Sequence, residues 1–207
     1  MPKIVDWDER RDEVLTATWR VISREGFPRT TIRKIAQEAG YSPGVLAHYF
    51  TNKQDILGSA LLLSHERVRK RMSQRAAELS GLEALRVIMI EALPLDDERD
   101  LEADIEISFW HQAMRDPELA RLELDEFDQL WNDLRDPLLE AKALGQLRPD
   151  LDIEEAVHSL MVLNDGLSAE RVLCPTRVLP ERQLALLDRL LASFTSASTR
   201  GQFSAGS

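Results

Sequence analysis

The stretch that decides the fold is residues 38–50, EAGYSPGVLAHYF. Its apolar residues are spaced as on one face of a helix, yet Pro43 and Gly44, the two poorest helix formers, stand side by side near its start. Ser42 before them is a preferred N-cap residue, and proline is tolerated at the first helical position because an amide proton there would have no helical partner. The pair therefore predicts the start of a helix at Pro43.

Two predicted helices lead up to this start. Apolar residues at helical spacing predict the first at residues 8–24, ending at Gly26, and a short second helix follows, capped by Thr30 or Thr31 and ended by Gly40. A short helix, a tight turn and another helix form a helix-turn-helix, whose second helix enters the DNA major groove N-terminus first. Because all-α proteins often contain similar packing, these residues alone leave a non-DNA-binding helical protein-interaction module as the alternative.

Charge is unevenly distributed along the 207 residues, whose formal net charge is -10. Residues 1–75 hold 14 lysines and arginines against 9 acidic residues, whereas residues 76–207 hold 12 against 27. A basic N-terminal part is typical of a module that meets a polyanion, and the acidic remainder indicates a different role. On charge alone, a merely solvated basic face is the alternative.

A longer run, TTIRKIAQEAGYSPGVLAHYFTNKQDIL at residues 30–57, resembles the N-terminal domain of TetR-family transcriptional regulators. Its part SPGVLAHYF further resembles the choline-responsive BetI branch of that family. The resemblance implies an all-α fold with about nine helices. An N-terminal three-helix helix-turn-helix DNA-binding domain, residues 1–54, would be joined by a long helix to a C-terminal helical ligand-binding and dimerisation domain, residues 55–196. Small and polar residues at 197–207 predict a disordered tail.

The resemblance and the residue chemistry together indicate the DNA contacts. Arg33 can reach a guanine edge through its forked donors, and Gly44 lets the helix end approach a base or a phosphate. The alternatives are a solvated Arg33 and a Tyr49 ring packed on the first helix. Many family members carry Tyr where this chain has Ala47, so a contact by that Tyr is not transferred. The expected DNA-binding residues are Thr31, Arg33, Tyr41, Ser42, Pro43, Gly44, Val45, His48, Tyr49 and Lys53.

The later part of the chain predicts further helices, with a kink or break at Pro137. They are expected at residues 82–93, 98–115, 117–144, 153–173 and 180–196. In proteins of the family that the chain resembles, the last two helices pair with those of a second subunit, and a dimer suits the two half-sites of a near-palindrome. Core packing within one chain is the alternative. The expected dimer-interface residues are Val157, Leu160, Leu167, Leu184, Leu187 and Leu191.

The resemblance also implies a small-molecule cavity within the C-terminal helices. Aromatic side chains could wall it, methionines could adapt its shape, and the polar Asn164 and Asp165 could point into it. Core packing is the alternative for each apolar residue. A quaternary amine would be attracted by aromatic faces together with an acid such as Asp165 or Glu106. The expected ligand-binding residues are Met89, Phe109, Trp110, Met114, Phe127, Trp131, Met161, Asn164 and Asp165.

Motifs of enzymes and of metal sites are absent from the sequence. The four histidines are scattered, no glycine-rich phosphate loop or nucleophile elbow occurs, and Cys174 is the single cysteine. No run approaches the roughly 18 apolar residues of a membrane span, so we expect a cytoplasmic protein without membrane contact. We therefore expect a repressor, not an enzyme, without cofactor or metal. It would bind a palindromic double-stranded DNA operator as a homodimer and be released by a small organic effector.

Overall fold

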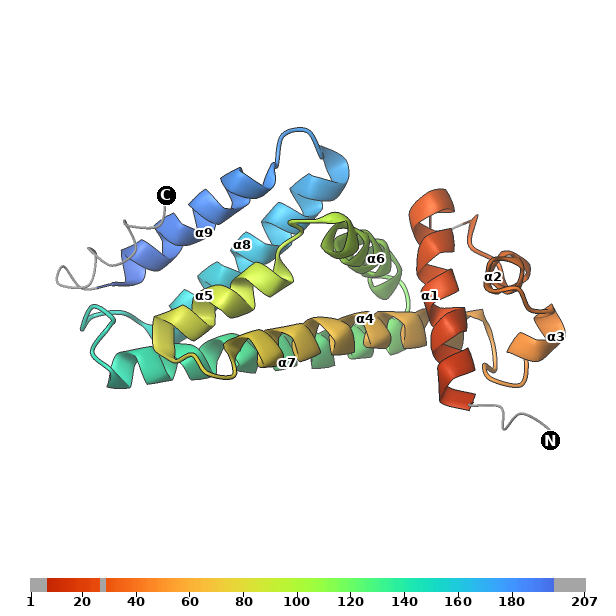
Figure 1. The fold of residues 1–207 in the computed structure, drawn as a ribbon, viewed down its shortest axis with the longest axis horizontal. Coiled ribbons are helices and arrows are strands. Elements are labelled where there is room, and N and C mark those ends of the chain that lie inside the picture. The colour runs from red at the N-terminus through yellow and green to blue at the C-terminus, as the bar shows by residue number, and fades with distance from the viewer. Residues whose placement is uncertain (1–6, 27–28, 196–207) are drawn as a thin grey trace. The chain divides into compact units, whose positions relative to one another are not determined.

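The computed structural model describes residues 7–26 and 29–195, and the tail predicted at residues 197–207 lies outside them. The described elements are helices, which confirms the predicted all-α class (Figure 1). No helix among these residues is long and apolar enough to cross a membrane. The helices are α1 (Trp7–Glu25), α2 (Ile32–Ala39), α3 (Pro43–Leu46), α4 (Lys53–Ala76), α5 (Gly81–Ala92), α6 (Asp97–Ala113), α7 (Pro117–Ala143), α8 (Ile153–Leu173) and α9 (Pro180–Phe194).

The starts of α2 and α8 are capped by side chains that accept hydrogen bonds from the free amides of the first turn. Thr31 caps α2, because its Oγ1 accepts from the backbone amide of Lys34 at 3.3 Å. Thr30, the other candidate, is buried and donates its hydroxyl proton to the carbonyl of Gly26 at 3.0 Å. Asp152 caps α8, and its Oδ1 accepts from two backbone amides at 2.9 and 3.2 Å. Local chemistry thus defines both starts.

The sequence predicts a kink or a break at Pro137; helix α7 continues through this residue, so the helix does not break there. Proline lacks an amide proton and costs a helix one hydrogen bond at this point. Leu134, three residues before Pro137, and Leu138, directly after it, are fully buried in the core. Packing of this face holds the helix together across the missing bond, as tertiary packing commonly does where local propensity is poor.

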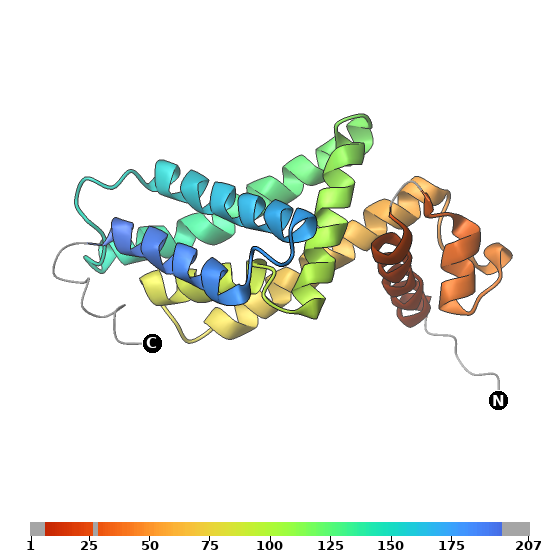
Figure 2. The same ribbon diagram turned by 90° about the horizontal axis from the view of Figure 1, so that it is seen from above.

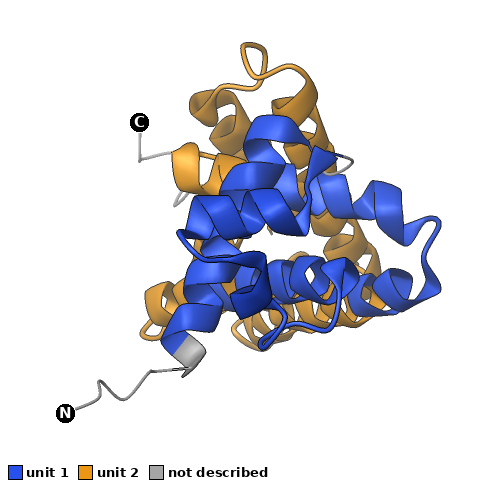
Figure 3. Cartoon of the chain, turned by 90° about the vertical axis from the view of Figure 1, so that its right-hand side faces the viewer, with its two compact units in different colours: residues 1–67, 104–123 blue, residues 68–103, 124–207 orange. Residues whose placement is uncertain are grey.

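The chain divides into two compact units (Figure 3). Unit 1 contains residues 1–67 and 104–123, and unit 2 contains residues 68–103 and 124–207. The units differ from the division after residue 54 that the sequence suggested. In unit 1, α4 packs closely on the start of α7, where a Cβ added to Gly58 would lie 3.2 Å from Cδ1 of Leu122. Residues 104–123, which are distant in sequence, therefore belong to the same unit as the N-terminal helices.

Unit 1 is held together by contacts between α1 and α4. The indole Nε1 of Trp19 donates to the carbonyl of Ala60 at 2.8 Å, and the guanidinium of Arg67 lies 4.4 Å from the Trp19 ring centroid. Arg11 donates to the hydroxyl of Ser59 at 2.8 Å. The apolar stripe predicted for the first helix is buried in this unit. Buried residues from α1 to α4 include Val14, Leu15, Val21, Ile22, Ile35, Ala36, Leu46, Phe50, Ile56 and Leu57.

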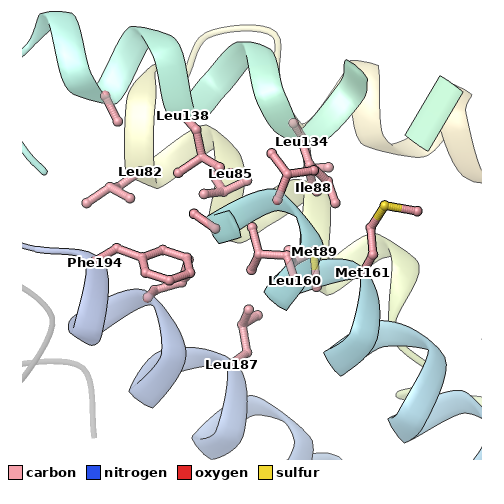
Figure 4. Close-up of a cluster of buried hydrophobic side chains, with 14 of the residues drawn as sticks. Leu82, Leu85, Ile88, Met89, Leu134, Leu138, Leu160, Met161, Leu187 and Phe194 are labelled. Atoms are coloured by element: carbon pink, nitrogen blue, oxygen red, sulfur yellow. The ribbon is translucent and has the colours of Figure 1, made fainter. Parts of the chain in front are cut away.

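Unit 2 is built around one apolar cluster to which α5, α7, α8 and α9 contribute (Figure 4). Helices α8 and α9 lie side by side in both ribbon views (Figures 1 and 2). An ion pair joins α5 to α9, since Arg86 binds Asp188 through two hydrogen bonds of 2.7 and 3.2 Å. Fully buried members of the cluster include Leu85, Met89, Leu134, Leu138, Val157, Leu160, Leu187 and Leu191.

Candidate functional sites

The helix that begins at Pro43 is short. Helix α3 ends at Leu46, and the amides of His48 and Tyr49 then bond three residues back, at 3.1 and 3.0 Å. Such bonds tighten the last turn of a helix. Ser42 has the extended backbone of an N-cap residue, although its side chain makes no capping hydrogen bond. The predicted helix start is therefore present, followed by one short turn of helix.

The surface around this start is small and open. We call the tip the set of exposed residues at the N-terminal ends of α2 and α3 and directly after α3, namely Thr31, Arg33, Ser42, Pro43, Gly44, Ala47 and His48. An added Cβ on Gly44 would meet a single atom, Oγ of Ser42 at 3.8 Å. Leu46, by contrast, is 1% exposed and anchors α3 in the core of unit 1. The tip thus presents backbone and short side chains on a firmly packed base.

Two neighbouring cations of α2 differ in their partners. The ammonium of Lys34 binds the carboxylate of Glu25 and the carbonyl of Arg29, the latter at 3.1 Å. Arg33 is exposed and forms no hydrogen bond or ion pair with any residue that the structure describes. A guanidinium carries five donors in a fixed fork that fits phosphate and the guanine edge. Arg33 is therefore the cation of α2 that is available to an anion or a base.

Three of the expected DNA contacts lie further back than the tip. Tyr41 donates its hydroxyl proton to the carboxylate of Glu13, and this hydrogen bond, with burial, raises the pKa of Tyr41. Tyr49 is half-buried beside the core, and burial lowers the pKa of the Lys53 ammonium. The remaining expected contact, Val45, is also half-buried. These four partly buried residues are placed to support the tip and do not form its exposed surface.

The structure corrects the interpretation of the charge distribution. Arg69, Arg71 and Arg75 contribute to the basic excess of the N-terminal part, but each binds carboxylates within unit 2. Residues 1–67 hold 10 lysines and arginines against 9 acidic residues. The excess therefore arises largely from cations that balance the acidic helices of the same chain.

An ion-pair network surrounds the N-terminal half of α6. Glu91 is 5% exposed and lies 3.4 Å from Arg71, 3.5 Å from Arg75 and 3.7 Å from Arg99. Arg71 also binds both carboxylate oxygens of Glu102, at 2.6 and 2.8 Å. Arg171 of α8 binds Asp100 of α6 in the same bidentate way, at 2.5 and 2.8 Å. We call the α6 cluster the set Arg71, Arg75, Arg99, Arg171, Glu91, Asp100 and Glu102.

The expected ligand-binding residues are divided between the two units. Phe109, Trp110 and Met114 belong to unit 1, where Phe109 is fully buried and Met114 is 77% exposed. Trp110 donates its indole proton to Oε1 of Glu106 at 2.9 Å, while His65 lies 2.5 Å from Oε2 of Glu106. Glu106, one of the two acids considered for a cationic ligand, thus has two partners within unit 1.

The other six expected ligand-binding residues lie in unit 2. Met89 and Met161 are buried in its core, as Figure 4 shows, and Phe127 and Trp131 pack against that core while half-buried. The Trp131 ring also lies near His158, with 6.5 Å between centroids. The polar pair completes the set: Asn164 and Asp165, both half-buried on α8.

The predicted dimer-interface residues are mostly buried within the single chain. Five of the six are at most 4% exposed in the core of unit 2, and Leu184 is half-buried. The opposite face of α8 is the exposed one. Val162 is 57% and Leu173 77% exposed. A stripe at helical spacing follows this face: Ser159, Val162, Gly166 and Leu173.

Among the residues that the structure describes, no group of three His, Cys, Asp or Glu side chains could hold a metal ion. Cys174 is exposed at the end of α8. The candidate sites that remain are the tip, the interior of unit 2 and the exposed stripe of α8.

Comparison with known proteins gives consistent matches to both parts of the chain. Residues 14–60 match the family described as bacterial regulatory proteins of the tetR family, and residues 81–196 match the BetI-type transcriptional repressor C-terminal family. The regulator PksA of Bacillus subtilis is 32% identical and covers 97% of both chains. A BetI regulator of Burkholderia cenocepacia is 31% identical, covering 81% of this chain and 84% of its own.

Solved structures share the fold. A transcriptional regulator from Saccharomonospora viridis, crystallised in complex with choline, superposes with a TM-score of 0.84. It is 22% identical, and the match covers 91% of this chain and 99% of that one. A TetR-type regulator from Rhodococcus sp. has a TM-score of 0.82 at 21% identity, covering 91% of this chain and 100% of its own.

Proposed function

The chain belongs to the TetR family of transcriptional regulators, with a BetI-type C-terminal part, and on that premise we propose that its tip reads operator DNA as one half of a dimer. A small organic ligand bound in unit 2 would favour a dimer geometry that no longer fits the operator. Such a ligand acts through its different affinities for the two geometries. The protein would then be a ligand-released repressor.

The DNA proposal rests on the exposed tip, which includes Arg33, an arginine that binds no other residue that the structure describes. Gly44 leaves the start of α3 without a side chain, so the backbone there can approach a phosphate or a base edge. Arg33 supplies the bidentate donors that discriminate guanine, and Thr31 and His48 supply exposed groups for phosphate oxygens. Tyr41 and Lys53, which are partly buried, are proposed to fix the register of the tip.

The substitution Gly44→Leu tests this proposal with little risk to folding. Gly44 does not have a left-handed backbone, and a side chain here meets open space in the free protein. On DNA, the same side chain would separate the helix start from the groove. We expect a mobility-shift titration on the promoter-proximal DNA of the chain's own gene to show at least a hundredfold weaker binding for the variant.

Light scattering and thermal melting provide the controls for Gly44→Leu. The variant and the wild type should both have the mass of a dimer and the same melting midpoint. Unchanged operator binding at fixed salt would remove the tip from the DNA interface. A monomeric wild type would remove the dimer from the proposal, and a non-DNA-binding interaction module predicts no operator shift at all.

We assign the dimer interface to the exposed stripe of α8 in place of the six residues expected from the sequence, five of which are buried in unit 2. Val162 and Leu173 would be covered by a second copy, and Gly166 would let the two helix backbones approach closely. The four residues of the stripe are uncharged, and the exposed Glu170 lies on the same face, four residues after Gly166 and three before Leu173. A stripe of small and apolar residues of this kind is suited to packing against a second α8 across a two-fold axis.

The proposed ligand is a small organic molecule held by unit 2. The choline complex of the Saccharomonospora viridis regulator supports a quaternary amine as the first class to test. Phe127 and Trp131 offer aromatic faces for a cation, and Asp165 offers a carboxylate. Met89 and Met161 are proposed to adapt the shape of the site.

A further inference from the structure

Asn164 lies in the middle of the buried face of α8. The residues three and four positions before and after it are Met161, Leu160, Leu167 and Ser168, and each is at most 8% exposed. Residues at these spacings share one face of a helix, so the four neighbours place the Asn164 side chain toward the interior of unit 2. An amide therefore interrupts an otherwise well-packed face.

The amide oxygen of Asn164 is buried and accepts no hydrogen bond from any residue that the structure describes. Its nitrogen faces Oδ1 of Asp165 at 3.5 Å. The opposite orientation would bring two acceptors together at this point, so the nitrogen belongs beside the carboxylate. The oxygen is consequently the atom that is directed away from Asp165 without a donor.

Comparison with a second buried amide shows why Asn164 needs an explanation. Gln183 is fully buried, and its oxygen, like that of Asn164, accepts no hydrogen bond from the residues that the structure describes. Its nitrogen, however, donates to the carbonyl of Pro94 at 2.7 Å and to that of Val178 at 3.3 Å. Gln183 therefore ties together the two loops that precede α6 and α9. Asn164 has no such structural bond in the described chain, and a leucine of similar size would remove the unpaired acceptor.

We infer that the oxygen of Asn164 accepts a hydrogen bond from the ligand, which must therefore carry an O–H or N–H donor. This inference rests on the proposed function, in which unit 2 binds a small organic molecule. A hydroxyl or a protonated amine can satisfy the oxygen, whereas an ether, a carbonyl or a fully alkylated nitrogen cannot. A tetraalkylammonium ion without a hydroxyl would leave the Asn164 oxygen unsatisfied, whereas a quaternary amine that also carries a hydroxyl would satisfy it.

The test compares choline with its O-methyl ether by isothermal titration calorimetry on the full-length protein. The two molecules have the same cation, but only choline has a hydroxyl donor. We expect the wild type to bind choline at least tenfold more tightly, because a site built for a donor rejects the analogue without it. In Asn164→Leu this preference should fall to about one. Equal binding of the two probes by the wild type would overturn the inference.

A matched control is Asn132→Leu on α7. Asn132 is exposed, and its nitrogen donates to the carbonyl of Asp128 in its own helix at 2.9 Å. This variant should keep the preference of the wild type for choline. If Asn132→Leu loses the preference as well, or Asn164→Leu retains it, the hydroxyl is not recognised by Asn164.

A second measurement needs no ligand. The melting midpoint of ligand-free Asn164→Leu should equal or exceed that of the wild type, because the variant loses an unpaired buried acceptor and gains apolar contact. A midpoint several degrees lower would show that the Asn164 oxygen has a structural partner, and would overturn the inference. If neither probe binds the wild type, the quaternary-amine class of the proposed function fails, and the melting midpoint still decides whether this acceptor is free for a ligand.

Discussion

The tip and the α6 cluster use the same kind of charge in opposite ways. Arg33 of the tip is exposed and has no partner in the described chain, whereas the Arg71 side chain of the α6 cluster is 22% exposed and binds three carboxylates. The pairs in the cluster offset the cost of burying charge. The exposed guanidinium of Arg33 incurs no such cost, because water solvates it. Whether a cation is free to bind an external anion therefore depends on its partners within the chain more than on the number of cations nearby.

The largest effect on stability is expected for Arg71→Ala, which tests the structural role of the α6 cluster. The substitution would leave Glu102, whose side chain is 11% exposed, without the arginine that binds it. It would also remove one of the three arginines near Glu91, whose side chain is 6% exposed. We expect urea denaturation to show a loss of about 3 kcal/mol in the free energy of unfolding. Arg75→Ala is the matched control, because its side chain is 68% exposed and it faces the same Glu91. It should cost less than about 1 kcal/mol. Similar losses for the two variants would contradict the distinction.

The second prediction concerns Arg33→Ala. Loss of its bidentate donors should weaken operator binding by roughly tenfold to a hundredfold in a mobility-shift titration. The melting midpoint should not change, since Arg33 has no partner within the described chain. Lys34→Ala is the neighbouring control, and it should affect DNA binding less because Glu25 already holds that ammonium. Equal effects of the two variants on DNA binding would mean that partners within the chain do not determine whether a cation is available to bind DNA.

The parts of this organisation that depend on local chemistry could be predicted from the sequence. Pro43 after Ser42 indicates a helix start because proline and N-cap preferences act within one turn. The inward stripe of α1, which includes Val14 and Val21, follows from helical spacing on a helix with one apolar face. Asp152 likewise identifies the start of α8.

The parts that depend on tertiary partners could not be predicted. Arg33 and Arg71 look alike in sequence, and the acids that bind Arg71 lie at least twenty residues away along the chain. Helix α8 has apolar residues on two faces. Helical spacing places Val157 and Leu160 on one face and Val162 and Leu173 on the other, but it does not show which of the two faces packs within the same chain. Helical spacing determines which residues share a face, and packing determines what the face meets.

The smallest expected effect is that of Glu102→Gln in the α6 cluster. Burial raises the pKa of the Glu102 carboxyl more than its two hydrogen bonds with Arg71 lower it. The folded protein then binds this proton more tightly than the unfolded chain does. Ionisation of Glu102 therefore lowers stability as the pH rises from the unfolded pKa through the folded one.

The glutamine variant keeps this position neutral at every pH. We expect it to be as stable as the wild type, or more stable by less than about 1 kcal/mol, in urea denaturation at pH 7.5. The difference should shrink as the pH approaches the unfolded pKa of about 4.3. A clear loss of stability at pH 7.5 would show that the bonds to Arg71 outweigh the burial of Glu102.

The close approach at Gly58 has a consequence for dissecting the protein. A fragment that ends after residue 54 would lack Ala60, which accepts the hydrogen bond of Trp19, and it would lack the helix that carries Gly58 itself. A fragment of residues 1–67 would restore that bond and still leave α4 without the Leu122 side chain that packs on Gly58. We therefore do not expect helices α1 to α3 to fold as a detachable module. Protein engineers who wish to transplant the tip should transfer the segment 104–123 together with it.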